Sequence, residues 1–252
     1  MKTFLTVVAA ATLFLQVSAF AHGGMVDLSV YDRTEGRRLQ VYWHEGRAYV
    51  AGRPGNEYQV TLRSRQSQDV LAVVSVDGVN VITGETADPS QSGYVLSPRG
   101  GLDILGWRKS LSQTAAFYFT ALPDSYAART GRPGDVGVIG LALFRRKQPA
   151  QPLSQAAPAA PRRSESVAEA RSDAASAGAL AKDERLGTGH GRQEHSPAVH
   201  VTFERATSAP AEVVTLYYDS HANLLARGII RDPVRVAPQP RPFPGFVPDP
   251  AG

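Results

Sequence analysis

Short apolar runs separated by turn residues fill the chain from residue 26 to about residue 147. This spacing is typical of a β-sandwich or barrel, because βαβ units would place long helical patterns between the strands. The run at 136–144 is apolar on both faces, which is typical of a central strand covered on both sides. The sequence therefore predicts an all-β fold, with an antiparallel β-sandwich over residues 22–147.

Two hairpins are the clearest local predictions in this region. The stronger one spans 70–82, where two β-branched runs flank the Asp-Gly pair at 77–78. The other spans 39–51 and turns at the Glu-Gly pair at 45–46, because glycine accepts a positive φ without steric cost. Between them, residues 57–64 alternate apolar and polar, so one face of that strand should enter the core.

The first 21 residues have the three regions of a secretory signal peptide. Lys2 precedes an apolar stretch at 4–17, and Ala19-Phe20-Ala21 is the small-x-small pattern that signal peptidase cleaves. The alternative interpretation of residues 1–21 is a buried N-terminal helix. The apolar stretch is too short to anchor in a hydrocarbon core of ~30 Å, and no later segment approaches that length. We therefore expect a periplasmic or secreted protein that is cleaved after Ala21 and has no transmembrane segment in its mature form.

The composition changes after the sandwich. Residues 148–186 are rich in Ala, Pro and Ser without any aromatic residue, which predicts a disordered linker. Residues 187–232 regain hydrophobic content and predict a small β-rich C-terminal module, too small to be stable alone, that docks on the sandwich or pairs with a partner's strand edge. Residues 233–252 form a proline-rich tail. Three strands are expected in the module, at 200–204, 212–218 and 224–230.

Charge and cysteine content restrict the partners and the chemistry. The chain has 27 Lys and Arg against 23 Asp and Glu, a formal charge of +4 that is spread along the sequence. We therefore expect a protein or a cell-envelope polymer as partner and no nucleic acid. The chain has no cysteine, which excludes disulfides, a lipid-modified cysteine and a thiol enzyme. A packed core must therefore supply the stability.

Two groups of residues are candidate metal ligands, although the favoured expectation is no cofactor. Cleavage after Ala21 gives His22 a free amine and an imidazole, which together can chelate copper, and His44 on a facing strand could complete the site. A frayed chain end is the alternative for His22. A second group could bind zinc and consists of His190, Glu194, His195 and His200. Its spacing is one residue longer than the His-x-x-Glu-His motif and it adjoins three glycines, so a solvated loop is the favoured interpretation.

Catalytic and nucleotide-binding motifs are weak. The glycines at 187–191 lack the Lys-Ser/Thr ending of a phosphate-binding loop, and they predict a flexible lead into the C-terminal module. No Gly-x-Ser-x-Gly elbow occurs, and sequence does not fix the separation of paired carboxylates. We therefore expect a protein that is not an enzyme, with a hydrolase whose site forms only in three dimensions as an alternative.

One aromatic residue and one loop are candidate binding elements. Tyr118 should face outward, because Phe117 and Phe119 alternate with it and should take the core. The loop beside it carries Arg129 and Arg132, whose guanidinium groups suit a carboxylate or phosphate. A solvated surface loop is the alternative.

Several segments resemble a family of exported proteobacterial proteins with no established activity. They lie at 75–81, 106–109, 115–120, 125–131, 136–140, 186–191 and 217–220. The resemblance covers the sandwich and the C-terminal module but neither the linker nor the tail. It implies export and this architecture, and it assigns no functional residue.

The expected function follows from this organisation. Two modules on a tether suit an exported non-enzymatic binding protein or an envelope-associated structural protein, because a linker raises the effective concentration of one site near the other. A periplasmic metal-binding protein that uses the histidines above for copper or zinc, and a hydrolase, are the alternatives.

Overall fold

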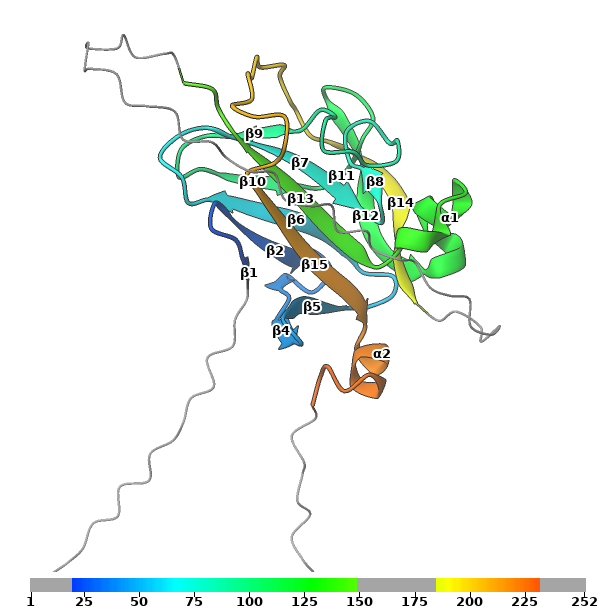
Figure 1. Ribbon diagram of the computed structural model, residues 1–252. Helices are drawn as coiled ribbons and strands as arrows, with labels where there is room; N and C mark the ends of the chain where they lie inside the picture. The colour runs from blue at the N-terminus through cyan, green and yellow to red at the C-terminus, as the bar shows by residue number, and fades with distance from the viewer. Residues whose placement is uncertain (1–19, 149–184, 232–252) are drawn as a thin grey trace, which may run out of the picture.

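The computed structural model describes residues 20–148 and 185–231 (Figure 1). Two β-sheets lie against each other and enclose one main core, which confirms the predicted all-β sandwich. The predicted signal peptide up to residue 19, the linker at 149–184 and the tail from residue 232 lie outside the described residues. No helix in the described part of the chain is long and apolar enough to span a bilayer.

Each sheet combines strands from distant parts of the chain. The first sheet, sheet A, contains β1 (Ala21–His22), β2 (Val26–Asp32), β3 (Arg37–Arg38), β6 (Glu57–Ser64), β10 (Gly101–Ile104), β11 (Gly106–Arg108), β12 (Gln113–Ala121) and β14 (Leu186–His195). The second, sheet B, contains β4 (Val41–His44), β5 (Arg47–Gly52), β7 (Val70–Val76), β8 (Val79–Asn80), β9 (Tyr94–Leu96), β13 (Val138–Arg145) and β15 (Glu212–Ser220). Two short helices, α1 (Tyr126–Arg129) and α2 (His221–Ala226), and 3₁₀ turns at Leu122–Asp124 and Pro133–Asp135 complete the described elements.

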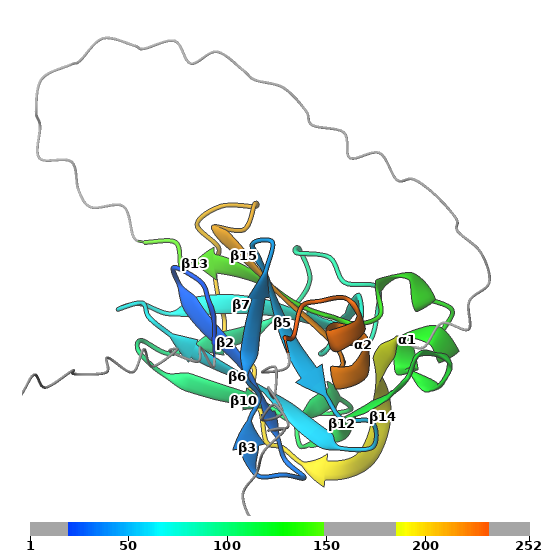
Figure 2. The same ribbon diagram turned by 90° about the horizontal axis from the view of Figure 1, so that it is seen from below.

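The core lies between the sheets and uses one face of each strand. On β6 the buried positions alternate as predicted, because Tyr58, Val60 and Leu62 all point inward. Sheet B is covered on both faces: α2 and the residues after it pack on the outer side of β5 and β15 (Figure 2), and Phe203 packs outside β7 and β13. The prediction that 136–144 is a central strand, apolar on both faces, is therefore confirmed.

Both predicted hairpins are present, and their turns explain why the sequence reveals them. Asp77 and Gly78 have φ of 52° and 70°, and Glu45 and Gly46 have φ of 48° and 73°. Positive φ at both central positions defines the type I′ turn, whose twist matches that of the flanking strands. The pairs β7–β8 and β4–β5 are antiparallel around these turns.

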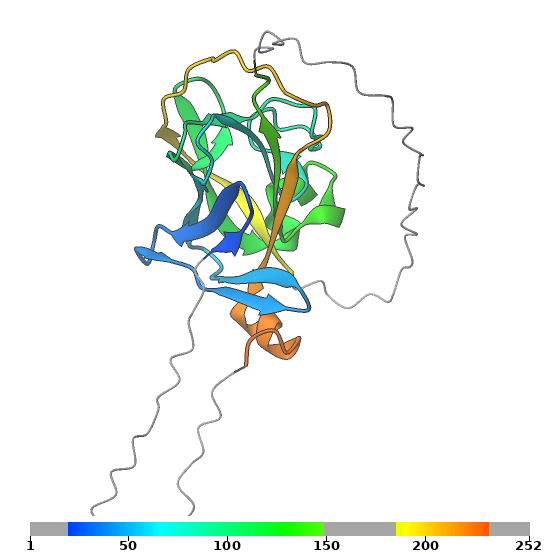
Figure 3. The same ribbon diagram turned by 60° about the vertical axis from the view of Figure 1, so that its left-hand side comes forward.

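The segment expected to form a small module after the linker supplies one strand to each sheet. β14 pairs with β12 over eight residue pairs in sheet A. β15 lies between β5 and β13 in sheet B, parallel to β5 and antiparallel to β13 (Figures 1 and 3). In its described part, residues 187–231, the segment is therefore β-rich but makes no sheet of its own, because its apolar residues, such as Leu216 at 0% exposure, complete the core of the sandwich. The structure does not support the tethered second module that motivated the expected function.

Three local predictions in this segment are wrong. Residues 224–230 form the end of α2 and a turn rather than a strand, because Ser220 caps the helix by accepting a hydrogen bond from the Asn223 backbone NH. Residues 200–204 form no strand, although the Lys147 NH donates to the Glu204 carbonyl. The glycines at 187–191 belong to β14 rather than to a flexible lead.

Close packing explains the glycines of β14. A Cβ on Gly189 would lie 2.2 Å from Cζ of Tyr118, and one on Gly187 would lie 2.6 Å from Cβ of Ser125. A side chain of any size at either position would displace its neighbour. The glycines therefore mark close packing within the sandwich.

Candidate functional site

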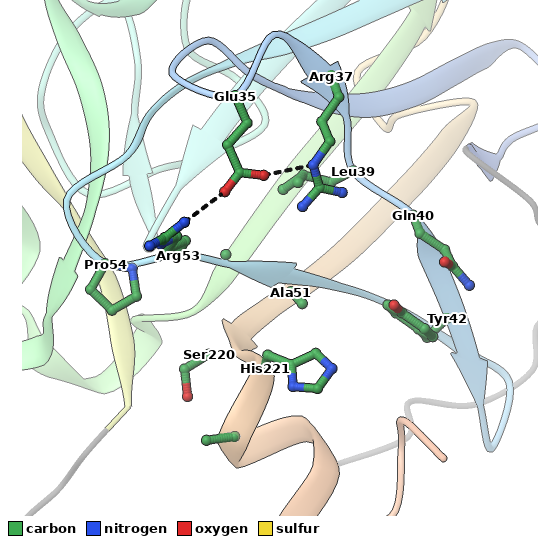
Figure 4. Close-up of a pocket in the computed structure, with 12 residues that line it drawn as sticks. Glu35, Arg37, Leu39, Gln40, Tyr42, Ala51, Arg53, Pro54, Ser220 and His221 are labelled. Carbon is green, nitrogen blue, oxygen red and sulfur yellow. Dashed lines mark hydrogen bonds and ion pairs between the residues drawn. The ribbon is translucent and has the colours of Figure 1, made fainter. Parts of the chain in front are cut away.

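An open pocket of about 560 Å³ lies at one end of the sandwich (Figure 4). The turn between β2 and β3 forms one wall, the start of α2 forms the opposite wall, and the β4–β5 hairpin lies between them. Ligand sites commonly fall in this size range, and they join an apolar lining to a few polar groups. Polar side chains in the lining come from Glu35, Arg37, Gln40, Tyr42, Arg53, Ser220 and His221.

Three charged side chains dominate the first wall. The Glu35 carboxylate accepts a hydrogen bond of 2.6 Å from Nε of Arg37 and one of 3.3 Å from Nη1 of Arg53 (Figure 4). The arginine side chains are 61% and 75% exposed, whereas that of Glu35 is 26% exposed. Hydrogen bonds from Arg37 and then from Arg53 hold the pKa of Glu35 below its usual value, so the carboxylate is ionised at neutral pH. The three groups together carry one net positive charge.

A buried aspartate fixes this wall from behind. Asp32, at the end of β2, accepts hydrogen bonds from the backbone NH groups of Thr34 and Glu35 at 3.0 and 2.8 Å. Its other oxygen accepts a bond of 2.8 Å from the amide of Asn56, which also donates to Glu35. Asp32 is 1% exposed and Asn56 is 8% exposed. The position of Glu35, and through it that of the guanidinium groups, is therefore set before any ligand arrives.

A second buried aspartate fixes the opposite wall. Asp219, 5% exposed, accepts hydrogen bonds from the Ser220 NH at 2.8 Å and from the Leu186 NH at 3.2 Å. It also accepts one from the side-chain amide of Asn223, on α2. This network joins the ends of β14 and β15 to the first turn of α2. His221, the first helical residue, is thereby held across the pocket from Glu35 (Figure 4).

The floor of the pocket depends on a glycine at the end of β5. A Cβ on Gly52 would lie 2.7 Å from two ring atoms of Phe119 and 2.8 Å from Leu186. The absence of a side chain lets the core aromatic ring approach the floor closely. Ala51 before this glycine and Pro54 two residues after it give the floor an apolar surface.

The predicted binding residues do not line this pocket. Tyr118 does lie on the outer face of sheet A, where its half-buried ring covers Gly189. Arg132 donates from both terminal nitrogens to the Gly84 carbonyl at 3.1 Å, so this guanidinium supports a neighbouring turn. Arg129 ends α1 and is exposed.

The structure does not bring the predicted metal ligands together. His22 belongs to β1 of sheet A and His44 to β4 of sheet B. His195 ends β14, and His200 is exposed in the loop that follows it. Within residues 20–148 and 185–231, no group of three His, Cys, Asp or Glu side chains is placed to hold a metal ion.

The two remaining candidates of that group have other partners. Glu194 accepts two hydrogen bonds of 2.7 Å from the guanidinium of Arg33, a bidentate ion pair that joins β14 to the turn after β2. The ring of His190 lies against that of Tyr126, with centroids 5.6 Å apart. Burial first, and then the nearby charge of Lys109, lowers the pKa of His190.

A buried polar cluster that sequence reasoning missed connects the two sheets. Asp77 accepts hydrogen bonds from the hydroxyl of Tyr218, from the Gly137 NH at 2.9 Å and from the Thr188 NH at 2.8 Å. The Thr188 hydroxyl lies 2.6 Å from the hydroxyls of both Tyr218 and Tyr58. Burial raises the pKa of Asp77 to about 6, against the opposing effect of these donors. The cluster is closed to solvent, and we assign it to stability rather than to ligand binding.

Comparison of the chain with protein-family models, curated proteins and solved structures finds no match.

Proposed function

We propose that this chain is an exported, non-enzymatic binding protein, and that the pocket between Glu35 and His221 holds its ligand. The main support for this proposal is that a buried aspartate fixes each of the two opposite walls of the pocket. Asp32 fixes the wall that contains Glu35, and Asp219 fixes the wall that contains His221. Fixed walls favour binding because little conformational freedom is lost when a ligand enters.

The chemistry of the lining supports binding over catalysis. The Glu35 carboxylate already accepts hydrogen bonds from two arginines and from Asn56, which leaves it a poor general base. The Ser220 hydroxyl accepts the capping hydrogen bond of α2, so its role is to stabilise the start of the helix. The groups that remain are guanidinium, amide, phenol and the imidazole of His221, and each can orient a ligand by hydrogen bonds.

Filling the pocket should abolish binding without unfolding the protein. Ala222 lines the pocket and is exposed on α2, so the indole of an Ala222→Trp variant should occupy the space of the ligand. The measurement is NMR titration of the ¹⁵N-labelled mature protein with a set of organic acids, sugars and amines. We expect at least one compound to shift the amide signals of Ala51 and Gly52 in the wild type, and none in Ala222→Trp.

The matched control is Ala226→Trp, which adds the same side chain to an exposed position at the other end of the helix. This variant should bind like the wild type. Equal binding by both tryptophan variants, or the lack of any compound that shifts these signals, would contradict the proposed pocket.

Export has a separate test. The sequence around Ala19 and Ala21 supports cleavage that leaves His22 as the first residue. This point falls within the two-residue strand β1, so cleavage removes Ala21, which is 2% exposed in the core, and leaves His22 at the new N-terminus. N-terminal sequencing of protein from the periplasm or medium should read His22, and an Ala19→Arg variant should keep the precursor mass. Full-length wild-type chain confined to the cytoplasm would refute export.

A further inference from the structure

We infer that the pocket takes a small organic anion whose carboxylate or phosphate group is bound by Arg37 and Arg53. The inference rests on the proposed function and names the chemical class of the ligand. It follows from the hydrogen-bond donors of the two arginines that have no partner, from the hydrogen bonds that Glu35 already accepts and from the size of the pocket.

The two arginines have hydrogen-bond donors to spare. A guanidinium carries five N–H donors in a planar fork that matches the oxygens of a carboxylate or phosphate. Arg37 bonds to Glu35 through Nε, and its two terminal nitrogens have no hydrogen-bond partner among the described residues. Arg53 bonds to Glu35 through Nη1, which leaves Nε and Nη2 without a partner in the same part of the chain. Both forks can therefore bind an anion while Glu35 keeps its contacts.

Glu35 positions these forks and is itself closed to a cation. Its carboxylate bonds to Arg37, Arg53 and Asn56, and its backbone NH is tied to Asp32. A cationic ligand would have to displace two guanidinium groups from this carboxylate. An anion instead meets the two exposed guanidinium groups, whereas the carboxylate of Asp32 is buried behind the turn.

The size and lining of the pocket indicate an organic molecule. About 560 Å³ is far more space than an inorganic oxyanion fills, and it falls in the range of small-molecule sites. Ala51, Pro54 and Ala222 offer apolar contact, and the ring of Tyr42, on β4, adds an aromatic surface to the lining (Figure 4). A ligand with an anionic head and a carbon body, such as an aromatic or branched acid, matches both parts.

Three probes of one shape separate charge from shape. Benzoate, phenyl phosphate and neutral benzamide share a phenyl ring, and calorimetric titration of the mature protein at neutral pH compares them. We expect benzoate or phenyl phosphate to bind about tenfold or more tightly than benzamide, because charge-assisted hydrogen bonds are roughly twice as strong as neutral ones. The anion that binds more tightly identifies the head group. Its affinity should fall as salt is added, since both arginines are exposed.

Variants assign the effect to the two arginines. Arg37→Gln with Arg53→Gln should weaken binding of the anion about tenfold or more and leave benzamide unchanged. Arg37→Lys with Arg53→Lys keeps the charge but loses the fork, so it should restore only part of the affinity. The matched control is Arg63→Gln, an exposed arginine on β6 outside the pocket, which should bind like the wild type. Thermal melts followed by circular dichroism verify that the variants fold. If the double variant does not fold, the single variant Arg53→Gln replaces it in the binding measurement.

The outcomes separate this inference from the proposed function. Three results would contradict the inference that the ligand is an anion. They are equal affinity for benzoate and benzamide, a double variant Arg37→Gln, Arg53→Gln that binds like Arg63→Gln, and no binding of either anion. If Ala222→Trp still blocks other compounds in that case, the pocket remains a binding site of different chemistry. If it blocks none, the proposed function fails as well.

Discussion

A mature chain that ends at Gln148 should fail to fold, although it retains most of the strands of the sandwich. The truncation removes β15, which pairs with β13 over six residue pairs and with β5 over five. Without it, sheet B separates into a β4–β5 hairpin and a unit of β13, β7, β8 and β9. It also removes β14 from the edge of β12.

The core packing that the removed segment supplies is comparable in size to the whole stability of a domain. Leu186, Leu216, Tyr218 and Leu224 are each at most 3% exposed. Deleting the side chain of one such residue costs about 2–5 kcal/mol, and a whole domain has about 5–15 kcal/mol. Circular dichroism and NMR should therefore show no cooperative unfolding and no dispersed amide signals for the truncated chain.

Two further chains make this expectation specific. A chain that ends at Arg231 keeps every described strand and should unfold like the full-length protein. Adding a peptide of residues 185–231 to the truncated chain should restore dispersed signals, because the strand pairs themselves hold the segment in place. Cooperative unfolding of the truncated chain alone would show that β15 is dispensable.

Stability should decrease between pH 4 and pH 7 through the ionisation of Asp77. Its pKa in the folded protein is about 6, above the usual value of 3.8, and burial is the main cause. Between these values the folded state binds more protons than the unfolded state, so the free energy of unfolding falls as the pH rises. A difference of about two pKa units corresponds to about 3 kcal/mol, present below pH 4 and lost above pH 6.

An Asp77→Asn variant isolates this contribution from other titrating groups. Asparagine tolerates the positive φ of the turn but cannot ionise. Urea unfolding across this pH range should therefore show a wild-type profile that falls by about 3 kcal/mol relative to the variant. Parallel profiles would show that Asp77 does not titrate in this range.

A change at Tyr218 tests the hydrogen bonds around the carboxylate. The hydroxyl of Tyr218 lowers the pKa of Asp77, so a Tyr218→Phe variant should raise that pKa and move the loss of stability to higher pH. Tyr217→Phe removes the same atom from the outer face of the strand and should leave the profile unchanged. A matching shift in both variants would argue against a specific role of the cluster.

The sandwich could be predicted because its strands and turns are local signals. The pair at 77–78 and the pair at 45–46 have the positive φ values that Asp-Gly and Glu-Gly turns favour. The inward residues of β6 follow the period of a strand. Each of these features depends on neighbours in the chain and needs no knowledge of distant contacts.

The placement of the last two strands could not be predicted, because it depends on distant pairing. β15 is parallel to β5, and the residues paired at Leu216 and Ala48 are far apart in sequence. The glycines of β14 look flexible until Tyr118 is placed beside them. For α2, in contrast, a signal was present: Ser220 begins a capped helix, and Gly228 follows it with a φ of 69°.

The candidate pocket was missed for a similar reason. Arg37, Arg53 and His221 have no informative spacing, and only the fold brings them to one cavity. The histidines at 190–200 and the arginines at 129 and 132 are close together in the sequence, whereas the residues that line the pocket are not. The informative local signal was the residue Asp32, whose position before a turn predicts hydrogen bonds to the following NH groups.

The central position of β15 also sets the order of events during synthesis. The ribosome makes β5 and β13 long before β15, so their facing edges stay open until about residue 220 has emerged. The nascent chain therefore cannot complete the hydrophobic core between its sheets until β15 has been synthesised. The sandwich therefore folds cooperatively only after β15 has been added between β5 and β13.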